Sequence, residues 1–345
     1  MSEATGAPRI AVVVATHGRR RLVERLLRAL AEQHVAGGFE VVLVDDASPD
    51  DTTAAAAALA PDLPYPLTVL RQDANTGAAG ARNRGWRHSA APLVAFTDDD
   101  CVPRPGWLAA LADRLDDVDL AVGRTVIPDD QAHLVGPWAY WTSVEEEVPH
   151  YPTCNIGYRR DVLDAVDGFD AAGFRYAARR RTAGAGAPLP RSVNGEDTDL
   201  AWRAKEAGAT SGFAGGAVVA HDVTVVGFRT TLRDIRRLEG LVLLCKKHPA
   251  LRAELGVGRF YRTPDHAALA LLVALARLAV RPRSTLAQAG VAAGGGWYVW
   301  MGHLGRMSPT PKVGWLWVLP LGFVIDVRAL WVMARASLRH RFLLL

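Results

Sequence analysis

Short β-branched runs alternate with longer stretches rich in Ala, Leu and Arg from residue 9 to residue 122. This rhythm predicts successive strand and helix units, which assemble into a mostly parallel sheet covered by helices. Strands are predicted at Ile10–Ala15, Phe39–Val44, Leu67–Leu70, Leu93–Phe96 and Leu120–Val122. Helices are predicted at Leu22–Gln33, Thr52–Ala60, Gly77–Ser89 and Gly106–Leu115. The predicted fold class is therefore α/β.

The composition changes beyond Pro264, where Ala, Leu, Val and Trp dominate. Because 345 residues are many for one hydrophobic core, we predict a main domain with an appendage. The main domain is placed at residues 1–262, with a nucleotide-binding part at 9–125 and an acceptor and catalytic part at 126–262. A hydrophobic helical extension follows at 263–345. Inside the main domain, the Gly-, Ala- and Arg-rich segment 171–194 is predicted to be a loop.

Charge and cysteine usage narrow the function classes. The net charge of +4 is small for this length, and no nucleic-acid partner is predicted. Runs of arginine at 19–21 and 179–181 could bind anionic partners such as phosphates or lipid headgroups. The alternative is that they are simply solvated surface. Cys101, Cys154 and Cys245 lie far apart, which predicts neither a disulfide framework nor a zinc site and favours a reducing cytosol. The N-terminal segment is predicted to be a first strand and not a signal peptide.

Three consecutive aspartates follow the fourth predicted strand, in "AFTDDDCVP". Like charges this close repel each other, so a cation is expected beside them. In extended backbone, residues two apart project to the same side, so Asp98 and Asp100 are predicted to face one cation while Asp99 points away. Oxygen ligands suit Mg²⁺ or Mn²⁺, which commonly bridge to substrate phosphates. A solvated acidic turn is the alternative.

A second pair of acids, Asp45 and Asp46, ends the apolar run of the second predicted strand. Carboxylates at such strand ends accept hydrogen bonds from a nucleoside base or a ribose hydroxyl. The alternative is structural, because Ser48, Asp50 and Asp51 suit the start of the helix that follows.

The segment "NTGAAGARNRGW" opens the third predicted helix with small residues. Exposed N–H groups and the positive end of the helix dipole at such a start attract an anion, and Arg82 and Arg84 add positive charge. The segment lacks both the G-x-G-x-x-G pattern and the lysine of a P-loop. Neither a dinucleotide-binding fold nor an NTPase is therefore indicated.

A third acidic group, Glu196 and Asp197, opens a predicted amphipathic helix over Glu196–Ala207. The helix dipole favours acids in the first turn, so a capping role alone explains them. A base that deprotonates an acceptor hydroxyl must lie within hydrogen-bond reach of it, and Asp197 follows a polar loop suited to that task. His221, near the end of an apolar strand, is either a structural histidine or a third metal ligand.

Taken in order, these motifs resemble those of the family 2 glycosyltransferases, an inverting class with the GT-A fold. The matching segments are "VVVATHGR", "VVLVDDASPDD", "NTGAAGARNRG", "FTDDD", "CNIGYRRDVLDAVDGFD" and "GEDTDLAWRAKEAG", within residues 9–222. The resemblance implies a Rossmann-like GT-A fold with a mixed, mostly parallel sheet. It also implies a Mg²⁺ or Mn²⁺ cofactor and a nucleotide-diphosphate sugar donor. The segment 171–194 departs from the pattern by its length, which leaves the acceptor geometry open.

The resemblance also assigns roles to residues at the matching positions. The implied nucleotide ligands are Thr16, Asp45, Asp46, Arg82, Asp98 and Asp99. The implied metal ligands are Asp98 and Asp100 of the D-x-D motif, together with His221. In the E-D motif, Asp197 would be the catalytic base beside Glu196. The donor and acceptor sugars would be lined by Asn155, Gly157 and Trp202.

The C-terminal extension contains two apolar segments, Ala267–Val280 and Val313–Ile325. They are 14 and 13 residues long, fewer than the roughly 20 that a spanning helix needs. Five of the ten tryptophans and several arginines accompany them, which is typical of segments at the interface of an anionic membrane. We predict a cytoplasmic protein that lies peripherally on the inner face of the cell membrane. A packed helical cap or an oligomer contact is the alternative.

The predicted function is inverting transfer of a sugar from a nucleotide-diphosphate sugar to a hydroxyl acceptor, which is a cell-envelope polysaccharide, a glycolipid or a metabolite. The alternative is a non-catalytic nucleotide-sugar-binding or membrane-associated scaffold. The joint presence of Asp98, Asp100 and Asp197 argues against that alternative. A nucleotidyltransferase is disfavoured because no Gly-rich loop with a lysine follows the first strand.

Overall fold

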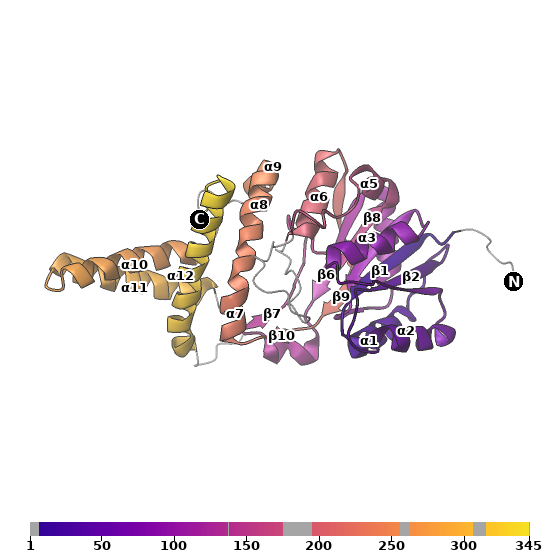
Figure 1. Ribbon diagram of the computed structural model, residues 1–345, viewed down its shortest axis with the longest axis horizontal. Helices are drawn as coiled ribbons and strands as arrows, with labels where there is room; N and C mark the ends of the chain where they lie inside the picture. Colours follow the sequence, from indigo (N-terminus) through magenta and orange to yellow (C-terminus); the bar gives the residue numbers. More distant parts are fainter. Residues whose placement is uncertain (1–6, 137, 175–194, 256–262, 306–314, 345) are drawn as a thin grey trace. The chain divides into compact units, whose positions relative to one another are not determined.

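One large sheet organises the part of the chain that the computed structural model describes, which is residues 7–136, 138–174, 195–255, 263–305 and 315–344. Its strands are β1 (Ile10–Thr16), β2 (Phe39–Asp45), β3 (Leu67–Arg71), β4 (Leu93–Asp98), β5 (Cys101–Pro103), β6 (Leu120–Val126), β8 (Asn155–Arg159) and β9 (Ser211–His221). Across the sheet they follow the order β3-β2-β1-β4-β8-β6-β9-β5. Figure 1 labels five of them, β1, β2, β6, β8 and β9. This sheet belongs to the first of two compact units, formed by residues up to 132 and residues 141–223.

The direction of the strands confirms the predicted fold class. β1 lies between β2 and β4 and is parallel to both, β3 is parallel to β2, and β9 is parallel to β6. β8 runs antiparallel to β4 and β6, and β5 runs antiparallel to β9. All five predicted strands are present and begin at the predicted residue. The sheet is therefore mixed and mostly parallel.

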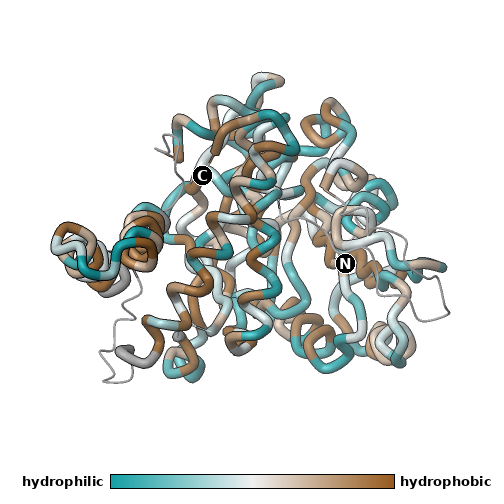
Figure 2. Tube along the Cα trace, turned by 60° about the vertical axis from the view of Figure 1, so that its left-hand side comes forward, coloured by the Kyte–Doolittle hydropathy of each residue, from teal (hydrophilic) through white to brown (hydrophobic). Residues whose placement is uncertain are grey.

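Helices cover both faces of this sheet. They are α1 (Arg20–Leu30), α2 (Thr52–Leu59), α3 (Ala78–His88), α4 (Trp107–Asp117), α5 (Arg160–Ala165) and α6 (Glu196–Glu206), with a 3₁₀ helix at Ala60–Asp62. The buried leucines of α1 and α4 pack with Val12 on one face, and α3 packs on the other. A Cβ at Gly85 of α3 would lie 2.5 Å from Val13 Cγ1, so glycine allows the close approach of this helix. Nearly all residues of β1, β2 and β4 are buried, as expected for a sheet covered on both faces. Figure 2 colours the chain by hydropathy.

The link between β4 and β5 requires the sheet to curl. β4 ends at Asp98 and β5 begins at Cys101, yet β5 pairs with β9 at the far edge of the sheet. Only Asp99 and Asp100 lie between the two strands, so that edge must return to the end of β4. The curl places the end of β9 beside the three aspartates, because Cys101 is the register partner of His221.

The segment from 136 to 170 shows no regular pattern in the sequence, yet it contains β8 and α5. β8 inserts between β4 and β6 as an antiparallel strand. Its short run includes Asn155 and Gly157, which weaken the strand signal. The greater part of the predicted loop 171–194, from residue 175 onward, lies outside the described residues.

The second unit comprises residues 133–140 and the chain from 224 onward, so the predicted domain boundary at 262 falls inside it. It contains β7 (Ala139–Tyr140), β10 (Thr224–Val225), α7 (Phe228–Asp234), α8 (Glu239–Lys247), α9 (Pro249–Glu254), α10 (Thr263–Val280), α11 (Thr285–Gly305) and α12 (Trp315–His340). Short 3₁₀ helices lie at Asp129–Leu134, across the start of this unit, and at Ile235–Leu238. Among the helices described, none combines the length and apolar composition needed to cross a bilayer.

Candidate active site

The carboxyl ends of three neighbouring strands form the edge on which the site is built. Thr16 at the end of β1 lies in register with Asp45 of β2, and Ala15 lies in register with Asp98 of β4. Acidic residues from separate segments therefore meet at one edge of the sheet, as predicted. This is the edge at which open α/β sheets bind ligands.

Asp45 is buried, and both oxygens of its carboxylate accept hydrogen bonds from protein groups. Oδ1 accepts hydrogen bonds from the amide of Ser48 at 2.9 Å and from the Ser48 hydroxyl. Oδ2 accepts from the Thr53 hydroxyl and from Arg71 Nη1, the latter at 2.7 Å. Burial opposes the negative charge, but the hydrogen bonds outweigh it and hold the pKa of Asp45 below its ordinary value. Asp45 thus fixes the loop between β2 and α2.

Asp46 performs a similar task for the loop before α3. Oδ1 accepts from Gln72 Nε2 and from the Thr76 amide, both at 2.7 Å, and Oδ2 accepts from the Gly77 amide at 2.8 Å. Gly77 has a φ of +82°, a conformation that side chains with a Cβ rarely adopt. The loop therefore depends on both the carboxylate and the glycine.

Both carboxylates are buried and bonded to protein donors, so they shape the loops of the site. That Asp45 and Asp46 also hold the nucleoside stays a prediction. The structural alternative is supported at the start of α2, where Asp50 Oδ1 accepts from the Thr52 amide at 3.2 Å and from the Thr52 hydroxyl at 2.6 Å.

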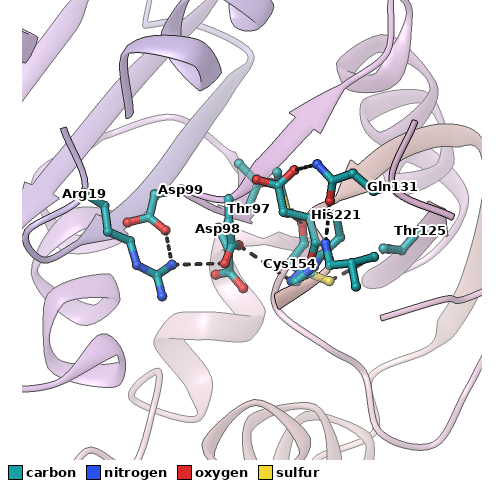
Figure 3. Close-up of polar contacts among 12 residues, drawn as sticks. Arg19, Thr97, Asp98, Asp99, Thr125, Gln131, Cys154 and His221 are labelled. Atoms are coloured by element: carbon teal, nitrogen blue, oxygen red, sulfur yellow. Dashed lines mark hydrogen bonds and ion pairs between the residues drawn. The ribbon is translucent and has the colours of Figure 1, made fainter. Parts of the chain in front are cut away.

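The three consecutive aspartates divide differently from the prediction. Residues 99 and 100 form a turn and not extended strand, so alternation of side chains does not apply to them. Arg19 Nη1 donates to Asp99 Oδ1 at 2.7 Å and to Asp100 Oδ2 at 3.0 Å (Figure 3). Thr16 Oγ1 donates to Asp99 Oδ2 at 2.7 Å, which places Thr16 on a carboxylate. Asp98 instead pairs with Arg82 Nη2 at 2.5 Å.

The free side of Asp100 faces His221. His221 Nδ1 lies 2.9 Å from the carbonyl oxygen of Asp222, which only accepts, so Nδ1 carries the proton. In the neutral ring Nε2 then carries a lone pair and can only accept. This nitrogen lies 3.6 Å from Asp100 Oδ1. That oxygen is buried and has no hydrogen-bond partner among the described residues. Two acceptors that face each other in this way fit a bound cation.

The chemistry of these donors fits a hard or borderline divalent ion. Asp100, Cys101 and His221 place one ligand atom each within 4.8 Å of one another. Cys101 Sγ donates to the carbonyl of Cys154 at 3.7 Å, and burial raises the pKa of this thiol. A neutral thiol is a poor ligand. The remaining oxygen and imidazole nitrogen suit Mg²⁺ or Mn²⁺, ions whose coordination shells are commonly completed by substrate phosphates.

Arg82 connects the aspartates with the third acidic group. This guanidinium is buried, and its Nε has no hydrogen-bond partner within the described part of the chain. Burial opposes its charge, but the negative charges of Asp98, Glu196 and Asp197 outweigh burial and raise the pKa of Arg82. One buried cation thus lies within the electrostatic reach of both the D-x-D motif and the E-D motif.

Asp197 has the electrostatic character of a general base. It lies in the first turn of α6, where its Oδ1 accepts from the Thr198 amide at 2.9 Å. Burial and the adjacent charge of Glu196 raise the pKa of Asp197 to about 7, although Arg82 acts in the opposite direction. A carboxylate with a pKa near neutrality exchanges protons readily with a substrate hydroxyl.

The structure places Asn155, Gly157 and Trp202, the residues predicted to line the sugars, at buried positions. Asn155 is fully buried and accepts from Trp107 Nε1 at 2.8 Å. A Cβ at Gly157 would lie 2.8 Å from the side chain of Leu115 in α4. Trp202 is buried, and its Nε1 donates to the carbonyl of Pro149 at 2.9 Å. These contacts give all three a structural role, and their place beside a sugar stays a prediction.

We expect Asn155→Ala to lower the free energy of unfolding by about 3 kcal/mol, since it leaves several buried polar groups without partners. Asn155 Nδ2 donates to the carbonyls of Arg124 and Ala217 at 2.9 and 2.8 Å, and both bonds are lost. Urea unfolding measures the change. Gln288→Ala, which removes an exposed amide, is the control. If the variant is as stable as the wild type but no longer binds the nucleotide sugar, Asn155 contacts the donor and the structural role is wrong.

Arg19 is the residue of the site whose individual role the sequence did not reveal. It stood out only as part of a basic run, which is usually a solvated face. The informative signal is its position four residues beyond Ala15, in the loop after β1, because that loop opens at the same sheet edge as the aspartates. The hydrogen bond between Thr16 and Asp99 was likewise not predicted, because it also joins the end of β1 to the turn after β4.

The fold is that of the GT-A glycosyltransferases. A solved structure of a mannosyltransferase from Pyrobaculum calidifontis, in complex with GDP-Man and Mn²⁺, matches with a TM-score of 0.60 and 23% identity. The match covers 95% of this chain and 88% of that one.

The sequence comparisons match the first part of the chain to a family of glycosyltransferases. Residues 11–167 match the family described as Glycosyl transferase family 2. The chain is 30% identical over 241 residues to the pre-mycofactocin glycosyltransferase of Mycobacterium tuberculosis, which covers 65% of this chain and 44% of that protein. It is 35% identical over 105 residues to the validoxylamine A glucosyltransferase of Streptomyces hygroscopicus, or 30% of this chain and 25% of that one. Over residues 11–167 the chain is thus similar to glycosyl transferase family 2, and it spans less than half the length of these relatives.

Proposed function

We propose that this protein transfers a sugar from a nucleoside-diphosphate sugar to a hydroxyl acceptor, with inversion at the anomeric carbon. The observation that carries the proposal is the arrangement around Arg82. The carboxylate of Asp98 pairs with it directly, and Asp197, whose pKa is near 7, lies within its electrostatic reach. The same site would therefore hold both the leaving nucleoside diphosphate and a base, Asp197, for the acceptor hydroxyl.

On the donor side, Asp100 and His221 would hold the divalent cation. That ion, when bound, offsets the negative charge that develops on the departing diphosphate. The carboxylate of Asp98 is 29% exposed, whereas that of Asp99 is 5% exposed. Asp98 is therefore the acid of this group best placed to accept a hydrogen bond from the ribose. Asp99 positions Arg19, and Arg19 in turn orients Asp100 Oδ1 toward His221.

On the acceptor side, Asp197 would accept the proton of the attacking hydroxyl. Attack by an activated oxygen on the anomeric carbon, with departure of the nucleoside diphosphate from the opposite face, is a single displacement and inverts that centre. Arg82 lies near both events, where its fixed positive charge stabilises the anionic groups on either side. Glu196 keeps the pKa of Asp197 high enough for the proton transfer.

The nucleoside is proposed to lie against the loops that Asp45 and Asp46 hold in place. These loops follow β2 and β3 and present backbone groups at the sheet edge. One relative is named a glucosyltransferase, and the Pyrobaculum calidifontis structure contains GDP-Man. We therefore propose a hexosyl donor without choosing its base.

The activity is proposed to take place at the inner face of the cell membrane, with an acceptor of the cell envelope. Supporting this location, the C-terminal helices carry exposed apolar side chains that include Trp297, Trp300 and Trp331. The side chains of Trp315 and Trp317, which the sequence placed in the same group, lie outside the described residues.

Calorimetry with nucleoside diphosphates tests the proposal against a scaffold that binds no donor. We expect UDP or GDP to bind at least about tenfold more tightly with Mn²⁺ than with EDTA, because a divalent ion held by Asp100 and His221 would offset the negative charge of the diphosphate. Release of nucleoside diphosphate from the matching nucleotide sugar then distinguishes an enzyme from a sugar-binding scaffold. Binding that ignores the metal, or no binding to any nucleotide, would contradict the proposed function.

A further inference from the structure

The hairpin of α10 and α11 exposes an apolar surface in the second unit. The two helices pack side by side along their length (Figure 1). We call the following exposed side chains the hairpin surface: Leu272, Val273, Leu275, Val280, Leu286, Trp297, Val299 and Trp300. At the end nearest α12 the hairpin is anchored, because Ala267 and Tyr298 are buried with Leu330, and Tyr298 Oη donates to Asp326 Oδ2 at 2.6 Å.

The hairpin surface is wider than the stripe by which a helix packs onto one neighbour. At 100° per residue, the exposed side chains from Leu272 to Val280 cover roughly 160° of the α10 surface. Val280 is 80% exposed and Leu286 is 77% exposed, one on each side of the tip. An apolar surface of this extent is unfavourable in water and marks a site of interaction.

Beyond Asp265 in the first turn of α10, the charged side chains of the hairpin are basic. From residue 266 to residue 300 the sequence contains no Asp or Glu, while Arg277, Arg281 and Arg283 lie at or near the tip and are exposed. The tryptophans Trp297 and Trp300 lie at the opposite end of α11, at 43% and 61% exposure. Apolar side chains flanked by arginine and tryptophan match the boundary between lipid headgroups and acyl chains.

We propose that the hairpin surface binds an anionic lipid bilayer, with α10 and α11 lying along the membrane surface. Insertion of the tip into hydrocarbon is disfavoured, since it would bury three guanidinium groups. In the flat orientation the apolar side chains enter the acyl boundary while the arginines meet lipid phosphates. The inference refines the location proposed above and is independent of sugar transfer, because lipid binding requires no donor.

Vesicle flotation of the full chain tests the lipid charge. We expect binding to vesicles of phosphatidylcholine mixed with phosphatidylglycerol, and weak binding to phosphatidylcholine alone. Replacing Arg277, Arg281 and Arg283 by glutamine should weaken binding to the anionic vesicles by about fivefold per arginine. High salt should weaken binding of the wild type about as much as the three replacements together. Equal binding to both vesicle types would overturn the proposal.

A second pair of variants tests the apolar contact. Val280→Glu with Leu286→Glu should abolish flotation, because carboxylates enter neither an acyl boundary nor an anionic surface. Leu338→Glu, at an 82% exposed position of α12, is the matched control and should float like the wild type. The alternative is that a second copy of this chain covers the hairpin surface. Light scattering without lipid tests it by measuring the oligomeric state. A dimer that Val280→Glu dissociates, together with no flotation of the wild type, would overturn lipid binding while leaving the catalytic proposal intact.

Discussion

The Asp197→Asn variant is expected to bind the nucleotide donor as tightly as the wild type and to lose transfer by a factor of about 10² to 10⁴, the contribution typical of a general base. An amide matches the carboxylate in shape but accepts no proton from the acceptor hydroxyl. Single-turnover measurement of transfer, beside calorimetry of donor binding, separates the two steps. Loss of both to the same degree would show that Asp197 belongs to donor binding.

The pH dependence identifies the base more specifically. Because the pKa of Asp197 is raised to about 7, transfer by the wild type should rise with pH through that value and then level off. Glu196→Gln removes the adjacent negative charge and should shift this rise to lower pH. A rise at the same pH in both proteins would assign the base to another residue.

Stability provides the control for Asp197→Asn. The folded protein binds the Asp197 proton more tightly than the unfolded chain, so the contribution of this group to stability falls as pH rises from its ordinary value of 3.8 to about 7. At pH 8 the wild type carries a buried charge that asparagine lacks. The variant should therefore be no less stable than the wild type in urea at pH 8. A strongly destabilised variant would make its activity loss uninformative and point to a structural role.

The Asp100→Ala variant is expected to lose divalent-ion binding and to reduce transfer by about 10³-fold, since it removes the ligand whose buried oxygen faces His221. The free Mn²⁺ signal in electron paramagnetic resonance measures ion binding without any donor. Asp116→Ala is the matched control, because it removes an exposed carboxylate of α4 that pairs only with Arg9 among the contacts described.

The two readouts of Asp100→Ala must move together. If the variant binds Mn²⁺ like the wild type, the ion belongs to another group. If it loses the ion yet keeps its transfer rate, the reaction does not depend on the ion. His221→Ala should weaken ion binding in the same assay, because its Nε2 is the second donor of the pair.

The repeating first part of the chain was the most predictable from sequence. Apolar periodicity located each of the first four strands, and their parallel order then placed the ends of β2 and β4 together. β8 escaped prediction because Asn155 and Gly157 interrupt its short run, and their roles depend on tertiary partners, Trp107 and α4. Local pattern contains no information about such partners.

At the site, residue identity was easier to predict than residue contact. The acids at 98–100 and 196–197 were found as candidates, but the division of the triplet between Arg19 and Arg82 depends on a turn that alternation does not describe. Asp45 and Asp46 were located correctly at the sheet edge, while their hydrogen-bond partners lie in loops whose conformation the sequence does not fix.

The two-residue link between β4 and β5 affects the order in which a nascent chain acquires its site. A ribosome releases the N-terminal strands first, and domains generally fold in that direction during synthesis. When β8 has emerged, the aspartates are present but β5 has no partner, because β9 has yet to be translated. His221 reaches Asp100 only when β9 docks. The proposed cation site is therefore complete only in the finished unit, because a chain that stalls before β9 lacks His221.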